Sequence, residues 1–191
     1  MATTTTSDVR LADRRPLSGR PVAATWIGGG LLWTAAGLGG LGADEGSGRF
    51  TASIAVWLVA QLVLLAGLVA LRAAAPWGAR RAGTVGLSVA VVGRLAFVAA
   101  EVVTLATGEL AEAVYPLGAM LSAVGMIVLG VAVVREGRWG GGARWAPLAA
   151  GIFPFVAMFP LVAAGGSPDL SIALWGVPLA LVGLGRESTG G

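Results

Sequence analysis

Two charged residues of opposite sign lie within one apolar run of this sequence, and they are its strongest candidates for chemistry. Arg94 and Glu101 both fall in the run 84–107. On an α-helix, residues seven apart share a face but are displaced by about 10 Å along the axis, which is long for a direct ion pair. We therefore expect a water molecule, a ligand group or a side chain of a neighbouring helix between them.

Two uncharged polar residues lie at similar depth in other apolar runs. Gln61 is central in the run 51–71, and Ser122 is near the centre of the run 114–134. Both offer hydrogen-bond acceptors to a guanidinium, as do carbonyl groups that prolines free in the fifth and sixth runs. The sequence thus predicts a polar intramembrane cluster formed by Arg94, Glu101, Gln61 and Ser122.

This cluster has two interpretations. It either holds the helices together, in which case Arg94 bonds to protein groups with no cavity beside it, or it forms a polar cavity for a ligand or a proton. Glu101 is the one acid inside the apolar runs, so it is the candidate if the protein catalyses a reaction. We expect its partners among Thr34, Ser171 and Trp175.

Several kinds of site are excluded by residue types that the chain lacks. It has no cysteine and no histidine, and all 13 of its basic residues are arginine. Thiolate nucleophiles, Cys/His zinc sites, histidine bases and lysine Schiff bases are therefore ruled out. We predict no cofactor and no metal.

The apolar runs themselves predict the fold. Hydrophobic residues make up 56% of the chain and charged residues 12%, against roughly 45–50% and about 25% in soluble domains. Six runs approach the roughly 20 residues that cross a bilayer as a helix. The sequence predicts an all-α integral membrane protein, a bundle of six transmembrane helices at about 22–41, 51–71, 84–107, 114–134, 146–164 and 169–185.

The charges between the runs predict an orientation. Arginines gather in alternate segments, whereas the other connections carry mostly acids, and cytoplasmic segments of membrane proteins retain arginine. The arginine-rich side holds Arg10, Arg14, Arg15, Arg20, Arg72, Arg80, Arg81, Arg135, Arg138, Arg144 and Arg186. The other side holds Asp44, Glu45, Arg49, Glu109, Glu112 and Asp169. Both termini are therefore predicted to be cytoplasmic, with a disordered tail at 1–20, a transmembrane domain at 21–186 and a short tail at 187–191.

The same charges predict the partners. With a net charge of only +3 and arginines that flank apolar runs, the basicity suits the bilayer and anionic lipid head groups at the cytoplasmic face, and nucleic acid is not expected. The overall pattern is that of a small bacterial protein of the cytoplasmic membrane. A homo-oligomer or a membrane-complex partner is a further expectation.

The leading functional hypothesis is a multi-pass, non-enzymatic protein that serves as a membrane-complex subunit or binds a small molecule or lipid. One alternative is a small, dimeric transporter, which needs a polar route to both faces. The other is an intramembrane enzyme that modifies a lipid or isoprenoid with Glu101 as acid, which needs a closed apolar pocket around that residue.

Overall fold

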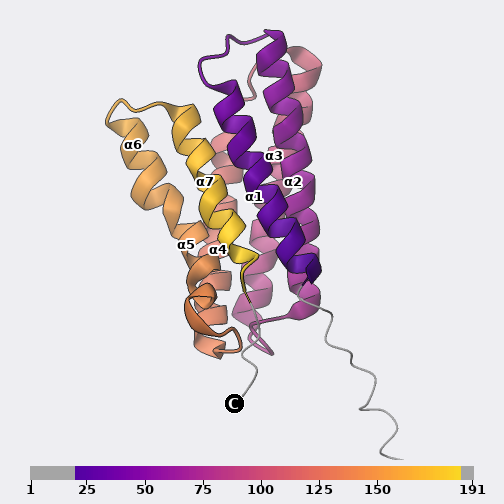
Figure 1. Cartoon of the computed structure of the whole chain (residues 1–191), viewed down its shortest axis with the longest axis vertical. Helices are drawn as coiled ribbons and strands as arrows, with labels where there is room; N and C mark the ends of the chain where they lie inside the picture. Colours follow the sequence, from indigo (N-terminus) through magenta and orange to yellow (C-terminus); the bar gives the residue numbers. More distant parts are fainter. Residues whose placement is uncertain (1–19, 186–191) are drawn as a thin grey trace, which may run out of the picture.

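The protein is helical, and the computed structural model describes residues 20–185 (Figure 1). Helices and connections, with no β-strand, make up this part of the chain. The helices are α1 (Arg20–Gly40), α2 (Gly48–Ala74), α3 (Arg81–Thr107), α4 (Val114–Glu136), the 3-10 turn η1 (Gly141–Trp145), α5 (Ala146–Phe153), the π-helical turn η2 (Pro154–Met158), α6 (Phe159–Ala163) and α7 (Pro168–Val182). The tails predicted at 1–20 and 187–191 lie outside the described residues, apart from Arg20, which begins α1.

The helices form a closed bundle. Each long helix packs against its neighbours in the chain, and α7 completes the ring by packing against α1 and α5. The start of α1 and the end of α7 lie at the same end of the bundle, beside the α2–α3 and α4–α5 connections (Figure 1). The arginine-rich connections therefore share one end, called the basic end below, and the α1–α2, α3–α4 and α6–α7 connections share the other, called the acidic end.

Five segments are long and apolar enough to cross a membrane. They comprise the four long helices and the continuous segment Gly141–Ala163, which joins η1, α5, η2 and α6. The sixth helix, α7, has only 15 residues, or about 22 Å of helix against a hydrocarbon core of about 30 Å. The prediction that the last run is the shortest is confirmed, but α7 alone falls short of a full span.

The distribution of side chains is the reverse of that in a soluble protein. Large apolar side chains such as Leu31, Val69 and Val156 are more than 60% exposed on the outer surface. A small group of polar and charged side chains, including Gln61 and Arg94, is instead buried inside the bundle. A continuous apolar exterior is stable in lipid and not in water, so this arrangement is that of a membrane protein.

Proline alters the fifth predicted helix without breaking it. At Pro154 the α-helix gives way to one π-helical turn, in which the Phe159 N–H donates to the Pro154 carbonyl five residues earlier. Proline has no N–H and its ring crowds the preceding turn, so a wider turn relieves the conflict. The helix then resumes as α6, which leans away from α1 towards the acidic end (Figure 1).

Glycines bring α3 and α4 into close contact. A Cβ at Gly86 would lie 2.5 Å from the backbone nitrogen of Leu129, and one at Gly93 would overlap the backbone of Ser122. Backbones that approach this closely gain van der Waals contact along their whole length, which is how small residues stabilise helix pairs in membranes. This contact fixes the position of α3 relative to α4 along the bundle axis, and α3 is the helix that carries Arg94 and Glu101.

We expect Gly125→Ala to destabilise the protein by about 1–3 kcal/mol, because the added methyl overpacks this contact. The methyl would overlap the Ala90 backbone nitrogen and lie 2.7 Å from the Gly86 carbonyl oxygen. The matched control is Gly28→Ala, since nothing lies within 4 Å of that position, and it should be neutral or slightly stabilising. Thermal unfolding in detergent micelles measures both, and equal shifts would contradict the close α3–α4 contact.

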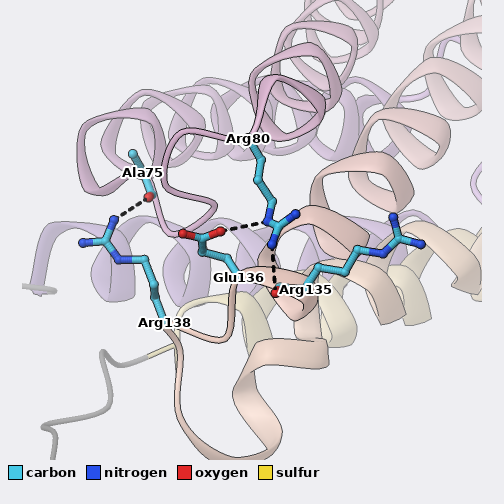
Figure 2. Close-up of polar contacts among 5 residues, drawn as sticks. All are labelled: Ala75, Arg80, Arg135, Glu136 and Arg138. Carbon is cyan, nitrogen blue, oxygen red and sulfur yellow. Dashed lines mark hydrogen bonds and ion pairs between the residues drawn. The ribbon is translucent and has the colours of Figure 1, made fainter.

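At the basic end, an ion pair joins the α2–α3 connection to the last residue of α4 (Figure 2). Arg80 Nε lies 2.8 Å from Glu136 Oε2, and Arg80 Nη2 donates to the Arg135 carbonyl at 3.3 Å. Arg138 Nη1 donates to the Ala75 carbonyl at 3.4 Å. The α2–α3 connection is thereby tied to the end of α4. Some arginines of the basic end therefore bond to the protein itself, a role that their position between apolar runs did not indicate.

Candidate functional site

A hydrogen-bonded chain of three side chains crosses from α2 to α3. Arg94 Nη1 donates to Gln61 Oε1 at 3.0 Å, and Gln61 Nε2 donates to Glu101 Oε1 at 3.3 Å. The amide of Gln61 thus occupies the gap that the seven-residue spacing leaves between the two charges, as expected for a side chain of a neighbouring helix. Of the predicted cluster, the structure brings together Arg94, Gln61 and Glu101.

These three side chains are buried but incompletely paired. Each is at most 1% exposed. Arg94 Nη2 and Glu101 Oε2 have no hydrogen-bond partner among the described residues. An unmade hydrogen bond from a buried charged group is costly. This hydrogen-bonded chain therefore leaves one donor on Arg94 and one acceptor on Glu101 without a described partner. A further polar group that bonded to either atom would be stabilised here.

Two predictions about partners are wrong. Ser122 supplies no acceptor to Arg94: it packs against Gly93 in the α3–α4 contact, and its Oγ has no hydrogen-bond partner within residues 20–185. The expected partners of Glu101 bond to backbone carbonyls of their surroundings instead. These bonds run from Thr34 to Ala173 at 3.1 Å, from Ser171 to Ser167 at 2.9 Å and from Trp175 to Ala150 at 2.7 Å. Hydroxyl groups in helices commonly donate to nearby backbone carbonyls. Similar depth in the membrane was therefore not enough to identify the partners of Arg94 and Glu101.

Three aromatic rings surround the guanidinium of Arg94. Its Cζ lies 5.1 Å from the ring centre of Trp33, 5.2 Å from that of Trp175 and 5.8 Å from that of Phe97. The rings also contact one another, with centres 5.5 to 6.3 Å apart. The negative face of an aromatic ring attracts a cation, most strongly away from water. The three rings, called the aromatic layer below, therefore stabilise the charge that the hydrogen bonds only partly satisfy.

Hydrogen bonds hold the indole rings in position. Trp33 on α1 donates to the Ile172 carbonyl of α7 at 2.7 Å, and Trp175 on α7 donates to the Ala150 carbonyl of α5 at 2.7 Å. Trp57 on α2 donates to the Trp33 carbonyl at 3.2 Å. Each of these three indole N–H groups thus has a partner on a different helix, which fixes the ring and joins the helices.

A cavity of about 480 Å³ lies in the acidic half of the bundle, between the aromatic layer and the acidic end. The aromatic layer forms its floor, and Glu101 borders it. Arg94, one turn deeper on α3 than Phe97, is not among the residues that line it. Its mouth is at the acidic end, where it is lined by Glu45 and Glu112 of the connections and by Asp169 in the first turn of α7.

The lining of the cavity is aromatic and acidic. Four carboxylates border it and, among residues 20–185, no arginine does. More than half of the chain's 13 tryptophan, phenylalanine and tyrosine residues also line it: Trp33, Phe50, Trp57, Phe97, Tyr115, Phe159 and Trp175. Such a surface is suited to an apolar molecule that carries a hydrogen-bond donor or a positive charge.

The aromatic layer is the part of the site that the sequence did not reveal. From the sequence, Trp33 and Trp175 look like residues that only fill the core. Both are buried in the core, and both also contact Arg94. The available signal was their depth, because both lie near the middle of their apolar runs, as Arg94 does. A buried arginine and tryptophans at equal depth suggest a cation–π contact.

Comparison with protein-family models, with curated proteins and with solved structures yields no match for this chain.

Proposed function

We propose that this chain is a six-span protein of the cytoplasmic membrane that binds a small organic molecule in the cavity above the aromatic layer, without catalysing a reaction. In this proposal α7 is the sixth span and both termini are cytoplasmic. Its short length is compensated because it packs between α1 and α5 as a member of the ring, and local thinning of the bilayer accommodates a short helix. The positions of the arginines support this orientation.

The observation that carries the proposal is the cavity that extends from the acidic end to Glu101. Its volume of about 480 Å³ falls within the roughly 300–1,000 Å³ of pockets that hold small molecules. Its walls are mostly apolar, and one buried carboxylate with an unpaired oxygen borders it. An apolar pocket with few polar groups is the usual form of a ligand site, in which those groups fix the orientation of the ligand.

The geometry favours binding over the two alternatives. A transporter needs a polar route to both faces, and here the aromatic layer closes the cavity towards the basic end. An enzyme with Glu101 as acid needs a pocket closed to water, whereas this cavity has its mouth at the acidic end. A binding protein needs only what the geometry supplies, which is an entrance, an apolar wall and a polar anchor.

The basic end is proposed to contact anionic lipid head groups. Arg72 and Arg81 are exposed there and border a common recess beside Trp77. Arginines at the cytoplasmic surface gain from the negative potential of anionic lipids. A second copy of the chain or another membrane subunit would pack against the exposed apolar surface.

Single cysteines test the proposal, because the chain has none of its own. In intact cells, a membrane-impermeant maleimide should label Ala119→Cys, whose side chain lines the cavity, and Ala113→Cys, which is exposed at the acidic end. It should not label Ala123→Cys, one turn deeper and fully buried, or Ala79→Cys, which is exposed at the basic end. Gel mobility after labelling gives the readout.

Two outcomes would contradict the proposal in different ways. Labelling of the Ala79 variant but not of the Ala113 variant would reverse the orientation. Labelling of the Ala113 variant alone would mean that water and solutes do not enter the cavity from outside, and the binding function would then fail.

A further inference from the structure

We infer that the ligand of this cavity is an organic cation with an apolar body, such as an alkyl or aryl ammonium ion. This inference rests on the proposed binding function and specifies its ligand class. Three features support it independently: the sign of the charges that line the cavity, the aromatic content of its wall and the unpaired oxygen of Glu101.

The charges select a cation at the entrance. Glu45, Glu112 and Asp169 line the mouth, and a cleft lined by charges of one sign and walled by apolar groups focuses the field on the entering molecule. No basic side chain of the described part of the chain lines the cavity. An anion would therefore meet repulsion at the mouth with no compensating partner inside.

The aromatic wall selects an organic cation over a metal ion. Inorganic cations need several oxygen ligands to replace their water, and beyond the mouth Glu101 supplies the only carboxylate among the described residues that line the cavity. An ammonium ion with carbon substituents is weakly hydrated, and its charge is stabilised by ring faces, as in the aromatic cages that bind quaternary ammonium groups. The wall offers rings from several helices, including Trp57 on α2 and Tyr115 on α4.

The carboxylate of Glu101 supplies the anchor at the floor. One of its oxygens accepts from Gln61, and the other, Oε2, accepts from no described residue. Glu101 is 1% exposed and also lines the cavity, so a shift of its side chain towards the cavity would bring Oε2 to the ligand. A hydrogen bond or contact between unlike charges in such a dry site is stronger than in water.

Arg94 does not contact the cavity, because the aromatic layer lies between them. Its charge faces three rings and Gln61. The same layer thus contacts a cation of the protein on its deep side and is available to a cation of the ligand on the cavity side.

Three small molecules of nearly equal shape test the inference on the purified protein in detergent. The probes are benzyltrimethylammonium, its uncharged isostere neopentylbenzene, and the anion phenylmethanesulfonate, with binding followed by quenching of tryptophan fluorescence. We expect the cation to bind at least about 10-fold more tightly than the other two. Glu101→Gln should weaken its binding by about 10-fold or more, without a similar effect on neopentylbenzene.

If Glu101→Gln does not yield folded protein, the mouth provides a second variant. Glu45 and Glu112 both lie in exposed connections, so the double variant Glu45→Gln, Glu112→Gln is expected to fold. It should weaken cation binding most at low salt, where charges act over the longest distance. The matched control is Glu109→Gln, an acid of the same α3–α4 connection that does not line the cavity, and it should have a smaller effect.

Tighter binding of the uncharged isostere or of the anion would overturn the inference about the ligand class and leave the binding function intact. Absence of binding by all three would also overturn it. The labelling of Ala119→Cys then decides separately whether the binding function itself fails.

Discussion

Replacement of Gln61 by leucine is expected to lower the free energy of unfolding by about 3–5 kcal/mol, the cost of breaking a buried charge network by removing one partner. The amide of Gln61 both accepts from Arg94 at 3.0 Å and donates to Glu101 at 3.3 Å. Leucine has similar bulk but offers neither interaction, so both charged groups would lose their one hydrogen bond to a side chain. Thermal and denaturant unfolding in detergent micelles measure the change.

Two comparisons identify the cause of this loss. Leu62→Ala alters the adjacent residue of α2, which is 52% exposed on the outer surface, and should cost less than about 1 kcal/mol because it removes little packing. The triple variant Gln61→Leu, Arg94→Met, Glu101→Met removes the whole network and should be more stable than Gln61→Leu alone, since no charge is left unpaired. If the triple variant is the less stable of the two, the charges do not depend on Gln61.

The sequence predicted the helical fold because bilayers impose a simple rule. Backbone polar groups in lipid must bond within the chain, so long apolar runs become helices. Four long helices and the bent segment 141–163 occur where apolar runs were found, and Pro154 marks the bend. The helices extend beyond the predicted limits, as in α2 and α3, because charged residues such as Arg72 continue a helix past the apolar core.

The contacts of the site were only partly predictable. The spacing of Arg94 and Glu101 on α3 implied that a third group lies between them, and the central depth of Gln61 made it a candidate. The rotation of α1 and α7 could not be deduced, because their apolar residues occur on all sides and no polar face indicates which side is inward. The contacts of Trp33 and Trp175 with Arg94 depend on that rotation, as does the cavity above them.

Replacement of Trp33 by alanine is expected to have the second large effect, a loss of about 3–5 kcal/mol, which is typical of removing a buried tryptophan. Trp33 is 2% exposed, contacts Phe97 and Trp175, and donates to the Ile172 carbonyl at 2.7 Å. Trp145→Ala is the matched control, because that tryptophan is 47% exposed and should cost less than about 1 kcal/mol. Unfolding in micelles measures both variants.

The same variant should also change what the cavity binds. With Trp33 removed, the aromatic layer loses one of the three rings between Arg94 and the cavity, and the free Nη2 donor becomes available to a ligand. We expect phenylmethanesulfonate to gain affinity and benzyltrimethylammonium to lose it, measured by calorimetry because the variant lacks one fluorescent ring. Trp33→Phe, which keeps a ring, should retain the preference for the cation. Equal losses for both probes in Trp33→Ala would mean that the layer supports the fold without separating Arg94 from the ligand.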